Sequence, residues 1–282
     1  MGLTMQLDAD VLHSRLLSIM KDFHKFCNEH KLQYYMLGGT CLGARRHQGF
    51  IPWDDDMDIG IPRKDYDRFC NELAEQLPEY LELRYYRNTP DSPMHYVKLI
   101  DRRTTLIENN YRNYVEGLYI DIFPLDAAGH GFAETLRWKK IWFLHNVVMY
   151  HCMTEKKQGV IKSFAQKWAR HTNLQKYHEK LERALTSKKF SDPPLTVNFL
   201  GAWGIKEVMD RSLFGTPQLY PFEDAEFYGP EKIDEYLMHL YGNYMQLPPE
   251  DQRVFRHNFF FLDLNQPYQE YILEHQNKEI KK

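Results

Sequence analysis

Residues 50 to 62, FIPWDDDMDIGIP, crowd four carboxylates into five positions between apolar neighbours. The four are Asp54, Asp55, Asp56 and Asp58. Like charges repel, and burying them without a partner is costly. The stretch therefore predicts a positive partner, either a basic side chain or a metal ion.

The spacing of these residues suits a divalent cation. If residues 54 to 58 are extended, Asp54, Asp56 and Asp58 share one face of a strand and Asp55 points to the other. Neighbours on one face lie roughly 6.5 to 7 Å apart at their Cα atoms, so their carboxylates can converge on one or two ions. Hard oxygen ligands favour Mg²⁺ or Mn²⁺. The spacing lacks the pattern of a calcium loop.

A third carboxylate is expected from elsewhere in the same sheet. Asp121 interrupts the apolar strand LYIDIF, where a carboxylate has no structural role. Asp126 follows Pro124 and is expected in a turn.

The segment GGTCLGARRHQGF, just before the acidic stretch, predicts a phosphate site. Gly38 and Gly39 let the backbone approach a ligand closely. Thr40 is the expected N-cap of a helix whose N-terminus favours an anion, and its hydroxyl is a further donor. Three basic side chains are candidates for phosphate contacts: Arg46, His47 and Lys98. Arg46 and Lys98 are also candidates for ion pairs with the carboxylates.

The elements that position these residues follow from hydrophobic periodicity and turn signals. The order expected in the first 126 residues is a helix over 7–30, a strand over 33–37, a helix after Thr40, a strand over 57–61, a helix over 63–77, and strands over 81–86, 95–100, 104–108 and 118–123. This alternation, followed by several strands in a row, predicts an α+β fold with a mixed sheet.

The second half of the chain differs in composition. Residues 131–190 are helical and basic in pattern, 191–230 look irregular and rich in Pro, Gly and aromatics, and 231–247 look like one more helix. We therefore expect a catalytic core over 1–130, a helical, aromatic-rich substrate-binding part of the same domain over 131–265, and a polar tail over 266–282.

Composition narrows the class of protein. The net charge of −3 in 282 residues gives no argument for a nucleic-acid partner. The four cysteines lack C-x-x-C spacing, which argues against a zinc knuckle and fits a reducing compartment. No apolar run approaches the roughly 20 residues of a membrane span. We expect a cytoplasmic protein. Its lysine pairs at 139–140, 156–157 and 188–189 suit peripheral contact with the inner membrane face, or simply a solvated helix face.

Several motifs together resemble the LicD family. They are GGTCLGARRHQGFIPWDDDMDIGIPRKDYDRF, LYIDIFPLD, YVKLIDRRTTL and YGNYMQLPPEDQRVFRH, and the likeness runs from about residue 15 to 258. This family is related to the fukutin-related proteins. The resemblance implies a nucleotidyltransferase core sheet like that of polymerase β, with a helical C-terminal part.

The resemblance also implies a reaction. Family members move a phosphorylated alcohol from a CDP donor to a sugar, and the best known attach phosphocholine from CDP-choline to bacterial surface glycans. The acceptor class is teichoic acid, lipopolysaccharide or capsule, and the acceptor is expected to be lipid-linked. CMP is released, with Mg²⁺ or Mn²⁺ as cofactor.

The motifs carry the family's site residues onto this chain. Asp56, Asp58 and Asp121 match the metal-binding carboxylates, and Asp54 matches a further acidic position and is a candidate proton acceptor. The donor-phosphate turn matches Gly38, Gly39 and Thr40. Five further positions match the family: Arg46, His47, Lys98, Arg253 and His257. Arg45 departs from the pattern, because relatives often carry a small apolar residue there.

Three alternatives remain open at this point. The alcohol is ribitol, glycerol or ethanolamine instead of choline, or the enzyme transfers a nucleoside monophosphate from an NTP to a small molecule. A binding protein with a degenerate site would lack one of the carboxylates. A choline donor would favour aromatic partners, and the candidates are Trp203, Phe214, Tyr220, Phe222, Tyr228 and Tyr241.

Overall fold

A mixed sheet forms the centre of the protein. The computed structural model describes residues 9–89, 92, 94–109, 114–154, 160–187, 194–255 and 259–279. Within these ranges the main sheet has eight strands, with β1, β2, β5, β4 and β10 side by side, β3 paired with β4, and β6 linking β5 to β7. The strands are β1 (Tyr35–Met36), β2 (Asp58–Pro62), β3 (Leu81–Arg84), β4 (Val97–Glu108), β5 (Val115–Ala128), β6 (Leu195–Val197), β7 (Val208–Asp210) and β10 (Phe259–Asp263). The predicted α+β fold is confirmed.

The long strands β4 and β5 form the backbone of this sheet. Residues 95–108 were expected to form two strands, because DRR interrupts the apolar pattern, but β4 is continuous. The register between β4 and β5 shifts after Asp101 instead. The Thr104 hydroxyl spans this irregularity by donating to Asp101 O and accepting from Leu118 N, both at 2.7 Å. The bulge therefore absorbs the charged residues without ending the strand.

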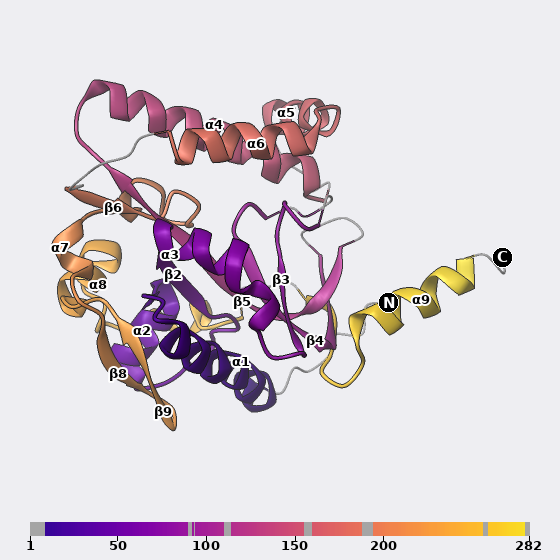
Figure 1. Cartoon of the computed structure of the whole chain (residues 1–282), viewed down its shortest axis with the longest axis horizontal. Helices are drawn as coiled ribbons and strands as arrows, with labels where there is room; N and C mark the ends of the chain where they lie inside the picture. The colour runs from indigo at the N-terminus through magenta and orange to yellow at the C-terminus, as the bar shows by residue number, and fades with distance from the viewer. Residues whose placement is uncertain are drawn as a thin grey trace.

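Helices from the first half pack close to the sheet (Figure 1). Helix α1 (Ala9–His30) buries one face, formed by Leu12, Leu16, Ile19, Met20 and Phe23. Helix α2 (Gly38–His47) connects β1 to the acidic stretch, and α3 (Arg63–Arg68) continues through a π-helical turn, Phe69–Leu73, and a 3-10 turn, Ala74–Gln76. The predicted order of elements is confirmed here.

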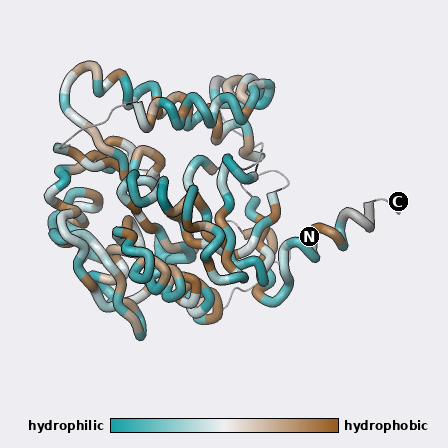
Figure 2. The backbone as a smooth tube through the Cα atoms, viewed as in Figure 1, coloured by the Kyte–Doolittle hydropathy of each residue, from teal (hydrophilic) through white to brown (hydrophobic). Residues whose placement is uncertain are grey.

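Three helices form a separate layer, at the top of Figure 1. They are α4 (Phe132–Cys152), α5 (Val160–Arg170) and α6 (Leu174–Leu185), as predicted for residues 131–190. Hydrophilic and hydrophobic residues follow one another along them in Figure 2. None of the helices in the described ranges is long and apolar enough to cross a bilayer.

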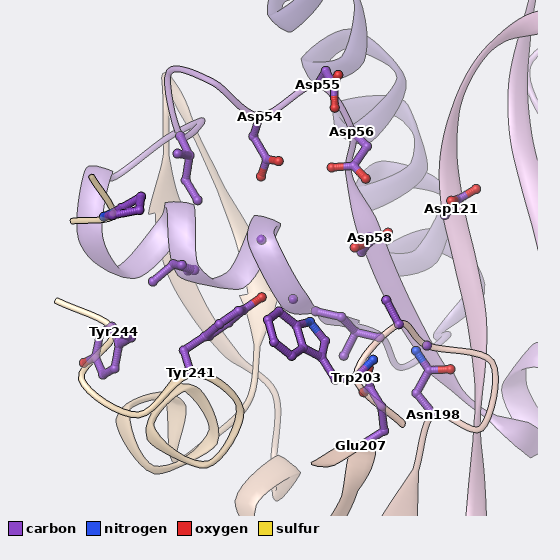
Figure 3. Close-up of a pocket in the computed structure, with 18 of the residues that line it drawn as sticks. Asp54, Asp55, Asp56, Asp58, Asp121, Asn198, Trp203, Glu207, Tyr241 and Tyr244 are labelled. Atoms are coloured by element: carbon purple, nitrogen blue, oxygen red, sulfur yellow. The ribbon is translucent and has the colours of Figure 1, made fainter. Parts of the chain in front are cut away.

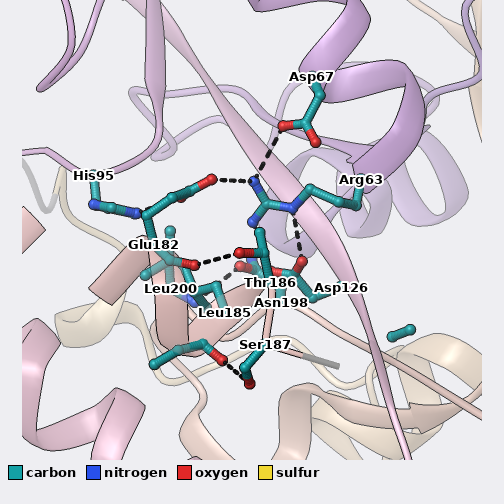
Figure 4. Close-up of polar contacts among 12 residues, drawn as sticks. Arg63, Asp67, His95, Asp126, Glu182, Leu185, Thr186, Ser187, Asn198 and Leu200 are labelled. Carbon is teal, nitrogen blue, oxygen red and sulfur yellow. Dashed lines mark hydrogen bonds and ion pairs between the residues drawn. The ribbon is translucent and has the colours of Figure 1, made fainter. Parts of the chain in front are cut away.

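Charged side chains attach this helical layer to the sheet (Figure 4). Arg63 forms a bidentate ion pair with Asp126, at 2.7 and 2.8 Å. The same guanidinium lies 3.4 Å from Glu182 on α6. Asp126 was expected in a turn, but it belongs to β5, because pairing with β6 extends that strand past Pro124.

Residues 191–230 are more regular than predicted. Besides β6 and β7 they form a 3-10 turn (Gly204–Glu207), α7 (Arg211–Phe214) and the antiparallel pair β8 (Gln218–Phe222) and β9 (Ala225–Gly229). Their strands are too short for a clear period-2 pattern, which explains the wrong prediction.

The C-terminal elements are short. Helix α8 (Ile233–Tyr241) stops earlier than predicted, because Gly242 ends it at φ 71°. A 3-10 turn covers Glu250–Gln252, and α9 (Tyr268–Glu279) is a helix inside the predicted polar tail that projects from the body in Figure 1. Although β6, β7 and β10 join the sheet of the predicted core, the division at residue 130 stays a prediction.

Candidate active site

A pocket of about 980 Å³ opens beside β2 and β5. Its lining includes the start of α2, the acidic stretch, Asn198, residues 200–203, Glu207, Tyr241 and several residues between 243 and 252. Figure 3 shows Asp54, Asp55, Asp56, Asp58 and Asp121 on one side of this pocket and Trp203, Tyr241, Glu207 and Asn198 on the other. The pocket therefore combines an acidic wall with a partly aromatic one.

The pairing of β2 with β5 places two of the predicted metal ligands side by side. The two strands are parallel, and Asp58 is in register with Asp121. Side chains in register on neighbouring strands point to the same face. The backbone N–H of Asp121 donates to Met57 O at 2.9 Å, and the Tyr96 hydroxyl donates to Asp121 Oδ2 at 3.3 Å. The sheet itself therefore brings these two carboxylates together.

Asp54, Asp55 and Asp56 are arranged differently from the prediction. Residues 54–57 are not a strand, since β2 begins only at Asp58. A turn closed by Asp54 N and Ile51 O, 2.8 Å apart, bends the chain there. One ligand oxygen of each of the three aspartates lies within 4.8 Å of the others. The predicted placement of Asp55 on the opposite face is therefore wrong, and Asp55 joins the acidic wall.

The acidic wall has an excess of negative charge. Burial raises the pKa of Asp58 well above its usual range, and the charges of Asp56 and Asp121 raise it further. A cation at this point would offset that repulsion. Several convergent carboxylate oxygens are the donor set that Mg²⁺ and Mn²⁺ prefer, so the residues present fit the predicted metal.

Two glycines let α2 approach this wall closely. Gly38 has φ +49°, which favours glycine, and its N–H donates to the Tyr236 hydroxyl at 3.0 Å. A Cβ on Gly39 would lie only 2.5 Å from Asp54 Oδ2. The helix begins at Gly38 after Leu37, so the prediction of Thr40 as N-cap is wrong. Thr40 is buried instead, and its Oγ1 accepts from Asp58 N at 2.8 Å, tying α2 to β2.

Three predicted basic residues lie around the pocket. Arg46 lines it and donates to Tyr244 O at 2.7 Å. His47 lies beside Arg46, with its ring perpendicular to that of Trp53 at 6.1 Å. The Arg253 guanidinium lies 5.5 Å from the centroid of the same Trp53 ring. Their contacts with a donor stay predictions.

Lys98 was predicted to contact phosphate, but its side chain does not line the pocket. It is buried, and its ammonium forms ion pairs with Glu116 at 2.7 Å and Glu108 at 3.2 Å. It pairs with Asp121 in the register of β4 and β5, but it is not part of the pocket lining. His257 lies outside the described residues.

Two of the six aromatic candidates line the pocket. The rings of Trp203 and Tyr241 are 4.9 Å apart and nearly perpendicular, at 83°. The other four are packed elsewhere: Phe214 against Tyr35 and Tyr236, Tyr220 through its hydroxyl on Pro230 O, Phe222 against Phe50 and Phe227, and Tyr228 against His24 and Tyr34.

The lining residues that sequence reasoning missed include Asp55, Tyr96 and Glu207. Tyr96 precedes Lys98 by two positions and Lys98 faces Asp121, so strand periodicity was a usable signal for Tyr96. Glu207 follows Lys206 in a segment that resembles a solvated turn, and nothing in the sequence distinguishes it.

The sequence is similar to a known protein family and to characterised relatives. Residues 31–158 match the family described as LicD/FKTN/FKRP, nucleotidyltransferase domain. Residues 31–158 therefore form a LicD-family domain, and the resemblance seen in the motifs is confirmed. It is 27% identical over 251 residues to the lipopolysaccharide cholinephosphotransferase LicD of Haemophilus influenzae, covering 86% of this chain and 92% of that protein. It is 45% identical over 42 residues to the human ribitol 5-phosphate transferase FKRP, covering 15% of this chain and 8% of that protein.

Proposed function

We propose that this protein is a metal-dependent phosphotransferase that moves phosphocholine from CDP-choline to a sugar of a bacterial cell-surface glycan and releases CMP. The observation that carries the proposal is the in-register placement of Asp58 and Asp121 in a pocket that also includes the start of α2. Support for choline comes from the Haemophilus relative, which is named a cholinephosphotransferase and aligns with this chain over 92% of its own length.

The metal would be Mg²⁺ or Mn²⁺, held by Asp56, Asp58 and Asp121, with Asp54 and Asp55 close by. When bound, such an ion neutralises charge on a diphosphate and on its leaving group. Arg46 and the N-terminus of α2 add positive potential on the neighbouring wall of the pocket. The diphosphate of the donor therefore belongs between α2 and the carboxylates.

The proposed reaction is a single in-line displacement. An acceptor hydroxyl oxygen forms a bond to the β-phosphorus of CDP-choline, and the bond from that phosphorus to the bridging oxygen breaks, so CMP leaves with the electron pair. The hydroxyl proton passes to a carboxylate, for which Asp54 is our candidate. Because little covalent work falls to the protein, its contribution is positioning and charge stabilisation.

Two other reactions use the same acidic wall. One is transfer of a nucleoside monophosphate from an NTP to a small molecule, which releases pyrophosphate instead of CMP. The other is the same phosphotransfer with ribitol, glycerol or ethanolamine as the alcohol. The human FKRP relative, named a ribitol 5-phosphate transferase, supports ribitol as the alternative. A degenerate binding protein is disfavoured, because all the expected carboxylates line the pocket.

Calorimetric titration tests the proposal directly. We expect CDP-choline to bind the wild type only when Mg²⁺ or Mn²⁺ is present. We expect Asp58→Asn to lose this metal-dependent binding. Asp224→Asn is the matched control, because Asp224 is an exposed aspartate paired only with Lys21 among the described contacts. If the protein does not bind CDP-choline but binds CTP and releases pyrophosphate on incubation, the nucleotidyltransferase reaction is favoured instead.

Contact with the inner membrane face is a further part of the proposal. Phe132, Leu136 and Phe143 are exposed along one face of α4, and Phe164 and Trp168 are exposed on α5. Phe143 and Trp168 lie 6.5 Å apart, so the two faces are continuous. Exposed lysines flank them: Lys139, Lys140, Lys162 and Lys167. The other two lysine pairs, 156–157 and 188–189, include residues outside the described ranges.

Aromatic and basic side chains together suit an anionic lipid surface, since rings insert at the headgroups and lysines meet lipid phosphates. We expect the protein to sediment with vesicles containing phosphatidylglycerol, and Phe164→Ser to reduce that binding. Leu219→Ser is the control, because it also replaces an exposed apolar side chain by serine, but on β8. Equal binding of wild type and Phe164→Ser would remove this face from the proposal.

A further inference from the structure

The wall of the pocket opposite the carboxylates contains an aromatic pair. Trp203 comes directly before the 3-10 turn Gly204–Glu207, and Tyr241 is the last residue of α8. Their rings meet at 4.9 Å and 83°. Figure 3 shows both rings facing the space below the acidic wall, with Glu207 beneath the indole.

Glu207 is a buried carboxylate on this wall, with only 7% of its surface exposed. Its Oε1 accepts a hydrogen bond from Trp203 N at 3.3 Å. Within the described ranges no ion pair joins it to a basic side chain, and burial raises its pKa to about 7. The adjacent Lys206 points elsewhere, because its Nζ donates to Leu240 O at 3.1 Å.

The chain is shaped around this carboxylate. A Cβ on Gly201 would lie 2.3 Å from Glu207 Oε1, so only glycine lets the 198–201 segment pass so close. A buried carboxylate without a cation is costly, yet the surrounding backbone holds it in place. This combination points to a cation that arrives with a ligand.

The aromatic pair lies next to the proposed diphosphate position. A Cβ built on Gly38 would lie 3.2 Å from Asp58 Oδ2 and 3.7 Å from the Tyr241 hydroxyl, so both groups lie close to Gly38. A donor whose diphosphate lies against the acidic wall would therefore extend its alcohol toward Trp203 and Glu207. Choline is short, which suits this spacing.

We propose that Trp203, Tyr241 and Glu207 form the subsite that binds the quaternary ammonium of the donor alcohol and so sets its identity. A trimethylammonium donates no classical hydrogen bond, and it is attracted to aromatic faces and to a nearby negative charge. Ribitol and glycerol carry no charge and would leave Glu207 without a counter-ion. The inference rests on the proposed function, because it needs a CDP-alcohol in the pocket.

The experiment compares CDP, CDP-choline and CDP-glycerol by calorimetry in the presence of Mg²⁺. We expect wild type to prefer CDP-choline over CDP-glycerol. Glu207→Gln should lower CDP-choline affinity about tenfold, because it removes the negative charge that faces the ammonium. Affinity for CDP should stay within about twofold of wild type. Glutamine keeps the acceptor for Trp203 N, so the turn is preserved.

Two further variants make the test specific. Trp203→Leu should also reduce CDP-choline affinity selectively, and Trp203 is 39% exposed, so its replacement spares the core. Asp224→Asn is the control, because it removes one exposed carboxylate that pairs with Lys21 and does not line the pocket. We expect Asp224→Asn to retain the choline preference.

The outcomes separate the two levels of the proposal. If wild type binds CDP-choline and CDP-glycerol equally, or if Glu207→Gln weakens all three ligands alike, the subsite is overturned and the CDP-alcohol reading stands. If wild type binds none of the three, the proposed function fails and the subsite fails with it.

Discussion

The pocket and the contact between α6 and the sheet both contain carboxylates removed from solvent, but their nearest charged neighbours differ. Basic side chains surround Glu182 at the contact, whereas other carboxylates surround Asp58 at the pocket. At the contact, Glu182 lies 3.4 Å from Arg63 and 2.9 Å from His95 (Figure 4). It also lies 3.0 Å from Arg87. Burial alone would raise the pKa of Glu182, but the hydrogen bond from His95 and the two arginines lower it to about 2.

At the pocket the balance is reversed. Burial and the neighbouring carboxylates raise the pKa of Asp58, and burial raises that of Glu207 to about 7. Groups whose ionised form the fold disfavours are typical of sites that a ligand completes. The sign of the pKa shift therefore differs between the two regions: it is downward for Glu182, which ties α6 to the sheet, and upward for Asp58 and Glu207, which line the pocket.

The largest effect should come from breaking the acidic wall. Asp58→Asn should lower transfer activity by about 10⁴-fold, because it removes a proposed metal ligand. Its melting temperature should stay equal to that of wild type or rise, because the change relieves repulsion. CMP release and differential scanning calorimetry measure the two. A large loss of stability would place Asp58 with Glu182, and the comparison would fail.

The opposite pattern is expected at the contact. Arg63→Met should cost about 3 to 4 kcal/mol of unfolding free energy, because Asp126 and Glu182 lose a buried partner. Affinity for CDP-choline should change little while the protein is folded. Asp67→Asn is the control, since its more exposed ion pair with Arg63 should contribute less than about 1 kcal/mol. Urea titration gives both values.

The acidic wall was largely predictable because its signal is local. Four aspartates next to apolar residues indicate function on physical grounds. Asp121 was found because it interrupts the apolar strand LYIDIF. The placement of Asp55 could not be predicted, because it depends on a turn at Ile51 that replaces the expected strand.

The aromatic wall and the contact with α6 were not predictable in the same way. Glu207 and Glu182 occur in unremarkable charged segments, and only tertiary packing buries one without a cation and surrounds the other with them. Hydrophobic periodicity and composition describe one helix or strand at a time. These roles depend instead on contacts between residues far apart in the sequence, such as Glu182 and Arg63.

A smaller effect should follow from adding the cation itself. Saturating Mg²⁺ or Mn²⁺ should stabilise wild type by about 1 to 3 kcal/mol, because binding to the folded state alone shifts the unfolding equilibrium. Asp58→Asn should lose this gain, and Arg63→Met should keep it at its lower baseline. Melting curves with and without EDTA provide the measurement, and equal gains in both variants would contradict the assignment.

The smallest effects concern pH, where the two regions should show opposite signs. The pKa of Glu182 in the folded protein, about 2, lies below the ordinary 4.5, so its stabilisation is present above pH 4.5 and is lost as pH falls toward 2. The unfolding free energy of wild type minus that of Glu182→Gln should therefore shrink between pH 6 and pH 3.5.

Glu207 should behave in the reverse way. Its pKa of about 7 in the folded protein lies above 4.5, so the folded state holds the proton more tightly and stability is lost as pH rises from 4.5 through 7. Asp58 from β2 and Tyr236 and Tyr241 from α8 are the other titratable groups that interact with it. Burial keeps the pKa of both tyrosines above this window, and Asp58 is common to wild type and variant. Glu207→Gln should therefore gain roughly 2 kcal/mol relative to wild type between pH 5 and pH 8, as urea titration at both values would show. A difference that is flat with pH would mean that Glu207 has a cation already, and would place it with Glu182.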